Sequence, residues 1–159
     1  MSILELTIDV ETIPTQSQVL IDSIDIKCPG NIKKPDSVQK WRDETRPGLI
    51  ENAVRKTSLD STKGELIVIG WAINDGAPEC VYRDYRDKTQ TEADLLQGFY
   101  DAIFRHFEAG YYDTTLWIGH NILSFDLPYL WHRSKINGIK STVRLPYNAR
   151  PWSESIFDT

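Results

Sequence analysis

The sequence predicts an α/β fold in which helices flank a mixed β-sheet. Two observations support this prediction. Short apolar runs of strand length alternate with stretches of helical periodicity, in the order strand, two hairpin strands, helix, strand, helix, strand. The chain has 159 residues, 40% of them apolar, which is enough to bury a core without a disulfide or a structural metal. We therefore expect one domain over residues 1–159.

Five segments are predicted to be strands because they are short, apolar and bounded by turn residues. They are residues 3–9, residues 65–73, residues 79–83, residues 114–118, and an element that begins at Ile156-Phe157. The turn signal Asn74-Asp75-Gly76 lies between the second and the third of these segments. It predicts that the two form an antiparallel hairpin.

The first long helix is predicted to begin at a capping box. Thr91 and Asp94 have the spacing of this motif, with Asp in place of the usual Glu. The apolar residues that follow recur with the period of a helix, and Gly110 ends the pattern. These apolar positions are Leu95, Leu96, Phe99, Ile103, Phe104 and Phe107.

The second long helix is predicted over about residues 125–136. Ser124 can cap its first turn, and Gly138 closes it. Residues 140–155 contain two prolines and no periodicity, so we expect a loop there.

Residues 13–63 differ from the rest of the chain and are predicted to be an insertion. They contain two stretches that can form short helices, residues 37–45 and 49–59, with Arg46-Pro47-Gly48 between them. We expect this insertion to be a structural cover over the core. The alternative is substrate binding through its lysines and arginines.

The cysteines and the hydropathy indicate where the protein works. Cys28 and Cys80 are the only cysteines and lack metal-binding spacing, so we expect no zinc site and a reducing compartment, the cytoplasm. No apolar run approaches the roughly 18 residues of a membrane span. Glu5 stands where a signal peptide would carry basic residues, so neither membrane insertion nor export is expected.

Charge is distributed unevenly. The net charge of −5 argues against non-specific nucleic-acid binding. Residues 127–153, however, contain no acidic residue and interleave cationic with aromatic side chains. These side chains are Tyr129, Trp131, Arg133, Lys135, Lys140, Arg144, Tyr147, Arg150 and Trp152. Such a stretch can hold a single strand and stack its bases. The alternative is a solvated helix face followed by an ordinary loop.

Two carboxylates follow the first predicted strand, and a third lies much later in the chain. Side chains alternate between the two faces of a strand, so Asp9 and Glu11 leave it on the same side. Asp126 adds a carboxylate beside the second long helix. Mg²⁺ usually binds one or two protein carboxylates together with phosphate oxygens of the substrate. The pattern therefore predicts a divalent-metal site for phosphoryl chemistry.

The residues around these carboxylates form two motifs of a known superfamily. Asp9-Val10-Glu11-Thr12 resembles the motif D-x-E-T, and Asn121-Ile122-Leu123-Ser124-Phe125-Asp126 resembles N-x-x-x-F-D. These are the first two motifs of the proofreading 3'-5' exonucleases, which have a ribonuclease H-like fold. The chain most resembles bacterial and phage exonucleases related to the exonuclease domain of family-B DNA polymerases. The two motifs are specific as a pair and weak separately.

The resemblance implies a role for each motif residue. Asp9 would bridge two Mg²⁺ or Mn²⁺ ions, Glu11 would bind one of them near the terminal 3'-hydroxyl, and Asp126 would help to hold the other. Thr12 and Phe125 would shape the pocket for the terminal nucleotide. Asn121 would orient the loop or contact the strand. His120 is expected to have a loop role, and Phe125 can equally be a core residue.

The superfamily has a third motif, Tyr-x-x-x-Asp or His-x-x-x-x-Asp on a final helix, which this sequence lacks after Asp126. We therefore expect a C-terminally truncated domain. Asp158 matches the Asp of a short segment that precedes that helix in the family, so we expect it to cap the next element and not to bind metal.

Two functions follow from this resemblance. The first is a metal-dependent 3'-5' exonuclease of replication and repair, acting on single-stranded DNA 3' ends and impaired in this short chain. The second is a non-catalytic nucleic-acid-binding module, or one half of a split or oligomeric nuclease. A homodimer or a replication partner would then cover the sheet face that the missing helix leaves open.

Overall fold

The structure is a computed structural model that describes residues 2–110 and 112–159. It contains two compact units. Unit 1 consists of Met1–Thr12 and Leu66–Thr159, and unit 2 consists of Ile13–Glu65. That the two units form one domain stays a prediction.

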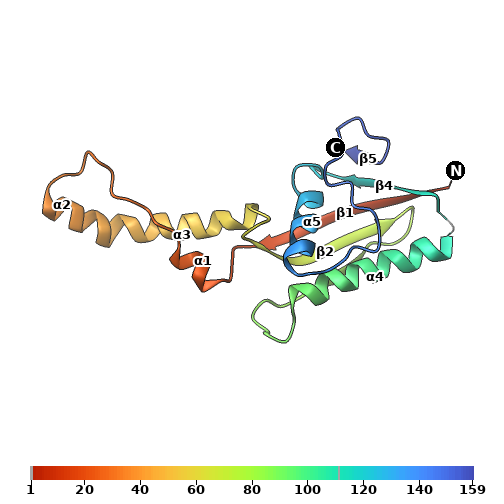
Figure 1. Cartoon of the computed structure of the whole chain (residues 1–159), viewed down its shortest axis with the longest axis horizontal. Coiled ribbons are helices and arrows are strands. Elements are labelled where there is room, and N and C mark those ends of the chain that lie inside the picture. Colours follow the sequence, from red (N-terminus) through yellow and green to blue (C-terminus); the bar gives the residue numbers. More distant parts are fainter. Residues whose placement is uncertain (1, 111) are drawn as a thin grey trace. The chain divides into compact units, whose positions relative to one another are not determined.

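A five-stranded mixed sheet forms the centre of unit 1 (Figure 1). Its strands are β1 (Ile3–Ile13), β2 (Glu65–Ile73), β3 (Glu79–Tyr82), β4 (Thr114–Gly119) and β5 (Ile156–Asp158). Their order across the sheet is β3-β2-β1-β4-β5. β2 and β3 pair antiparallel, whereas β4 runs parallel to both β1 and β5. The predicted α/β fold with a mixed sheet is therefore confirmed.

Burial alternates along β1 as the sequence pattern requires. Its even-numbered side chains from Leu4 to Val10 are at most 5% exposed, whereas the odd-numbered ones from Ile3 to Glu11 are exposed. The strand continues to Ile13, four residues beyond the predicted end, because the alternation and the β-branched residues Val10 and Thr12 extend past Asp9.

Helix α4 (Glu92–Gly110) begins at the predicted capping box. The Asp94 N–H donates to Thr91 Oγ1 at 3.1 Å, and the Thr91 N–H donates to Asp94 Oδ2 at 3.3 Å. Most of the apolar positions predicted for this helix are buried against the sheet, but Phe104 is 37% exposed.

Helix α5 (Asp126–Ile136) ends as predicted but begins differently. Asn137, Gly138 and Ile139 form a Schellman motif, with Gly138 at φ +68° and the Ile139 N–H donating to the Ser134 carbonyl at 2.9 Å. The prediction that Ser124 caps the helix is wrong. The N-cap is Phe125, which makes no side-chain cap bond, because the backbone N–H groups of Ser124 and Phe125 turn back to the Asn121 carbonyl.

A buried ion pair ties both helices to the sheet. The Arg133 Nη2 atom lies 2.6 Å from Glu92 Oε2, and the two side chains are 9% and 5% exposed. The Glu92 carboxylate also accepts hydrogen bonds from the Leu66 N–H and from Asn137 Nδ2, both at 2.7 Å. α4 and α5 also meet where the hydroxyls of Tyr100 and Ser134 lie 2.8 Å apart. The start of β2, the start of α4 and the end of α5 therefore share one polar network.

Unit 2 is helical and contains an interrupted helix. Its elements are α1 (Gln18–Asp22), α2 (Pro35–Lys40), a π-helical turn (Trp41–Thr45), α3 (Arg46–Lys56) and a 3-10 turn (Thr57–Leu59). We predicted two helices separated at Arg46-Pro47-Gly48, but the helix runs through these residues. Pro47 has no N–H and its ring would clash with the carbonyl of Asp43. The preceding turn widens, and the Arg46 N–H donates to the Trp41 carbonyl five residues earlier.

Across the described residues, 2–110 and 112–159, no helix combines the length and the apolar character needed to cross a membrane.

Candidate active site

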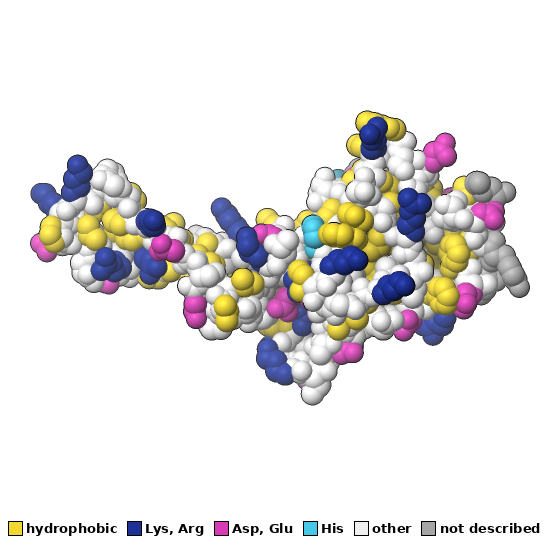
Figure 2. Space-filling view, in the orientation of Figure 1, with side chains coloured by type: hydrophobic (Ala, Val, Ile, Leu, Met, Phe, Trp, Pro, Cys, Tyr) yellow, Lys and Arg dark blue, Asp and Glu magenta, His cyan; other side chains and the backbone are white. Residues whose placement is uncertain are grey.

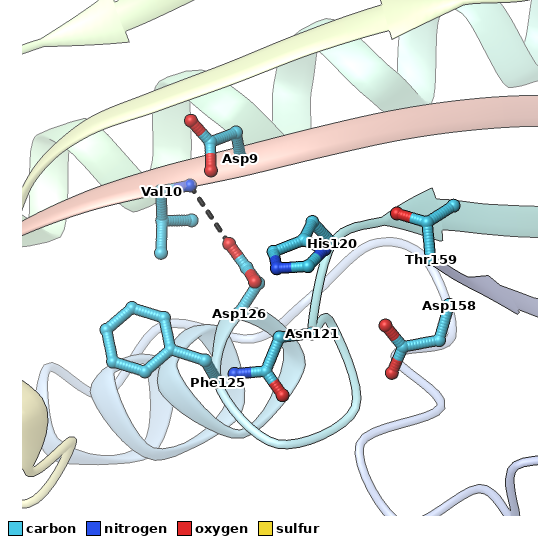
Figure 3. A pocket seen from close by; sticks show the side chains of 8 residues that line it. All are labelled: Asp9, Val10, His120, Asn121, Phe125, Asp126, Asp158 and Thr159. Atoms are coloured by element: carbon cyan, nitrogen blue, oxygen red, sulfur yellow. Dashed lines mark hydrogen bonds between the residues drawn. The ribbon is translucent and has the colours of Figure 1, made fainter.

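An acidic pocket lies at the carboxyl edge of the sheet. β1, β4 and β5 are parallel, so their C-terminal ends meet at one edge, where open α/β sheets bind ligands. The residues that line the pocket are Asp9, Val10, His120, Asn121, Phe125, Asp126, Asp158 and Thr159 (Figure 3). They come from β1, from the loop between β4 and α5, from the start of α5, and from the end of the chain.

Asp126 is the buried carboxylate of the pocket. It is 4% exposed, and its Oδ1 atom accepts a hydrogen bond of 3.0 Å from the Val10 N–H, drawn in Figure 3. Burial and, to a smaller extent, the negative charges of Asp9 and Asp158 raise the pKa of Asp126 to about 6, although the hydrogen bond from the Val10 N–H acts in the opposite direction. Asp126 therefore shares the pocket with two other carboxylates that disfavour its charge.

The loop between β4 and α5 is held from two sides. Gly119 ends β4 so close to β1 that a Cβ there would lie 3.0 Å from the Ile8 carbonyl oxygen. Asn121 has a φ of +53°, in the left-handed region, which reverses the chain at the start of the loop. Asp158 Oδ1 and Oδ2 accept hydrogen bonds from the N–H groups of Ile122 at 3.1 Å and Leu123 at 3.3 Å.

Asp158 differs from our expectation. We predicted that it would cap the next element, but it caps the loop 121–125, which precedes it in the chain. The reason is that β5 pairs with β4 and places Asp158 opposite Gly119 in the register. The Thr159 N–H also donates to the Gly119 carbonyl at 3.0 Å. An Asp at the end of a strand parallel to β4 is a signal that could have placed it in the pocket.

The structure brings together four of the six predicted site residues, namely Asp9, Asn121, Phe125 and Asp126. Glu11 is exposed on the same side of β1 as Asp9, two residues further along, and Thr12 is half-buried. Neither is among the described residues that line the pocket.

Two aromatic side chains of the site have distinct surroundings. The ring of Phe125 packs on that of Tyr129 with centroids 5.1 Å apart, so Phe125 contacts the core and lines the pocket at once. His120, for which we expected a loop role, lies in the loop after β4. It is exposed there and lines the pocket.

The carboxylates of the pocket fit a hard cation whose remaining ligands come from the substrate and from water. Within residues 2–110 and 112–159, no three His, Cys, Asp or Glu side chains are arranged as a preformed metal cluster. Mg²⁺ nevertheless needs only one or two carboxylates, because phosphate oxygens and waters complete its shell. Asp9 and Asp126 supply that number, and a cation bound beside them would offset the burial and the carboxylate repulsion that raise the pKa of Asp126.

The fold and this pocket define an α/β domain of nuclease-like architecture. The family model of the exonuclease domain of family-B DNA polymerases matches residues 55–156. The chain therefore belongs to this family, and the resemblance found in the sequence is confirmed. The match includes Asn121, Phe125 and Asp126, whereas Asp9 and Glu11 precede it.

Among the solved structures that are similar to this chain is one whose similarity covers most of the chain's length. It is the family B DNA polymerase from the hyperthermophilic archaeon Pyrobaculum calidifontis, with 18% sequence identity and a TM-score of 0.46. The similarity covers 88% of this chain and 12% of that polymerase, so the chain spans a small part of its length. No curated protein matches the chain.

Proposed function

We propose that this chain is a metal-dependent 3'-5' exonuclease that shortens single-stranded DNA from its 3' end. One observation carries the proposal: the buried Asp126 accepts a hydrogen bond from the Val10 N–H and lines, together with Asp9, a pocket at the carboxyl edge of the sheet. Membership of the exonuclease-domain family supports it independently.

Each of the six predicted site residues would have a part in this reaction. Asp9 and Asp126 would hold Mg²⁺ or Mn²⁺, and Glu11, two residues along β1, would face the end of the strand. Divalent ions bound there supply a water of lowered pKa and neutralise charge on the phosphate. The half-buried ring of Phe125 offers a face for the terminal base, and Asn121 offers an amide to the sugar or phosphate. Thr12 stays a proposed neighbour of the terminal nucleotide.

The Val10 N–H and Asp158 position these groups and do not themselves react. The Val10 N–H fixes the Asp126 carboxylate, and Asp158 fixes the loop that carries Asn121 and Phe125. Preorganised donors of this kind place the reacting groups before the substrate binds.

The second candidate is a non-catalytic module that binds single-stranded nucleic acid, alone or with a second copy or a replication factor. Two observations favour it. Glu11 is outside the pocket lining, and both oxygens of Asp158 are occupied by backbone N–H groups. Such a site would bind a cation and a strand without cleaving it.

The test is digestion of a 5'-labelled single-stranded DNA in Mn²⁺ by the wild-type chain and by Asp9→Asn. We expect a ladder that shortens from the 3' end, and a loss of about 100-fold or more in rate for the variant, because a placed metal contributes several kcal/mol. Glu5→Gln is the matched control, since Glu5 is exposed on the same side of the same strand, four residues earlier.

The outcomes separate the candidates. Equal digestion by the wild type and Asp9→Asn would mean that this pocket does not catalyse the reaction. Mn²⁺ that raises the melting temperature of the wild type but not of Asp9→Asn, without any digestion, would favour the binding module.

A further inference from the structure

The acid-free stretch of residues 127–153 divides into buried and exposed members in the structure. Arg133 is buried in its ion pair with Glu92, and Tyr129 is 1% exposed in the core. The remaining cations, Lys135, Lys140, Arg144 and Arg150, are all exposed. Within the described part of the chain, no carboxylate forms a salt bridge with any of these four.

Two aromatic groups accompany these cations. The rings of Trp131 and Tyr147, both half-buried, stack with centroids 4.2 Å apart and planes inclined by 19°, and Lys135 Nζ lies 5.9 Å from the Trp131 ring centre. The Trp152 side chain is 75% exposed, and the guanidinium carbon of Arg150 lies 5.7 Å from its ring centre. We call these five residues the aromatic-basic surface.

The two parts of the aromatic-basic surface are close to each other. Tyr147 and Arg150 are three residues apart, so their Cα atoms are at most about 11 Å apart. The Ser153 N–H donates to the Arg150 carbonyl at 2.9 Å, a turn that keeps Arg150 and Trp152 together. Figure 2 shows hydrophobic side chains with Lys or Arg side chains beside them over α5 and over the loop before β5, on one face of unit 1.

Chain geometry limits how far the same surface can lie from the acidic pocket. Trp131 follows Asp126 by five residues of α5, which is about 7.5 Å along the helix axis. Trp152 precedes Asp158 by six residues, which limits their separation to roughly 20 Å. A strand a few nucleotides long can therefore reach from the pocket to both aromatic groups.

We propose that the aromatic-basic surface binds the single-stranded DNA that leads to the pocket, by stacking bases on Trp152 and on the Trp131–Tyr147 pair while Lys135 and Arg150 neutralise phosphates. The proposal depends on the proposed exonuclease function only for the direction of the strand, whose 3' end would lie in the pocket. Sequence-tolerant stacking combined with unpaired cations is the chemistry of single-strand recognition. An exposed tryptophan beside an arginine, in a stretch of chain without acidic residues, suits a polyanion with flat bases.

The test is fluorescence anisotropy of a labelled 20-nucleotide dT strand in EDTA, where no digestion occurs. The variant is Arg150→Gln/Trp152→Ala, chosen because both side chains are exposed and their loss leaves the core intact. We expect Kd to rise about tenfold, since stacking of one base and one phosphate contact are lost. The slope of log Kd against the logarithm of the salt concentration should also decrease by about 0.7, because one phosphate contact is lost.

The chain offers a matched control. Arg86 also lies 5.7 Å from an aromatic ring centre, that of Tyr85, but beside Asp84 and after β3, at the opposite edge of the sheet. Arg86→Gln/Tyr85→Ala removes the same kinds of group and should change Kd less than twofold.

The failure of this proposal differs from the failure of the exonuclease proposal. An aryl ester of thymidine monophosphate is small enough to occupy only the pocket. Its rate of hydrolysis in Mn²⁺ should be equal in the wild type and in Arg150→Gln/Trp152→Ala. A wild type that binds the dT strand but does not hydrolyse the ester would contradict only the exonuclease. An unchanged Kd in the variant, binding confined to an RNA strand, or a changed oligomeric state with unchanged Kd would overturn the aromatic-basic surface as a DNA site.

Discussion

At the scale of single residues, the buried carboxyl of Asp126 lowers the stability of the folded protein at neutral pH. A carboxyl whose folded-state pKa is about 6 instead of 3.8 binds protons more tightly when folded. The folded state therefore loses stability as pH rises from about 4 to about 6, and the loss remains at higher pH.

Asp126→Asn should remove this cost and keep the acceptor for the Val10 N–H. The raised pKa of Asp126 corresponds to a loss of about 3 kcal/mol at most in the free energy of unfolding. Solvent screening in an open pocket reduces this loss to about 1 kcal/mol. We expect the metal-free variant to melt about 2–4 °C above the wild type at pH 7.5 and at the same temperature near pH 3.5. Thermal unfolding in EDTA at both pH values measures this. A variant that melts lower than the wild type at pH 7.5 would contradict the assignment of the raised pKa.

At the scale of elements, the Arg133–Glu92 pair connects α4, α5 and β2. Arg133→Met would leave the Glu92 carboxylate buried without its partner, and we expect a loss of about 3–5 kcal/mol in the free energy of unfolding. Arg55→Met is the control, because Arg55 and Glu51 form an exposed pair of 2.8 Å on one helix, worth under about 0.5 kcal/mol. Urea unfolding of both variants makes the comparison, and equal losses would refute the structural role of the buried pair.

At the scale of the whole molecule, the two units differ in how much apolar surface they bury. Among the described residues of unit 1, nineteen hydrophobic side chains are buried in the core. In unit 2, among the residues that the structure describes, Trp41 is the buried hydrophobic side chain. Local opening costs less where few apolar contacts are lost, so we expect amides of α3 to exchange with solvent faster than those of α4. Hydrogen exchange followed by mass spectrometry measures both helices in one experiment, and slower exchange in α3 would show that unit 2 is stabilised by something other than its own core.

Much of the fold could be predicted from the sequence because the signals are local. Alternation along β1, the hairpin turn between β2 and β3, the capping box of α4 and Gly138 after α5 each act through neighbouring residues. Where two local signals competed, the prediction was wrong. Ser124 was a plausible cap, but the turn at Asn121 engages its backbone, and Pro47 widens a helix that its sequence suggested it would break.

The sequence by itself determined the strands, the long helices and the resemblance to the exonuclease domains, which the family match over residues 55–156 confirms. Only the tertiary structure decided which side chains share the pocket. Asp158 enters it because β5 pairs with β4, a contact between residues far apart in the chain, whereas Glu11 stands outside the lining although it is two residues from Asp9. The structure also separated the buried Arg133 from the exposed cations. Residue type and spacing carry local geometry, but pairing and burial depend on the whole chain and become visible only when it is folded.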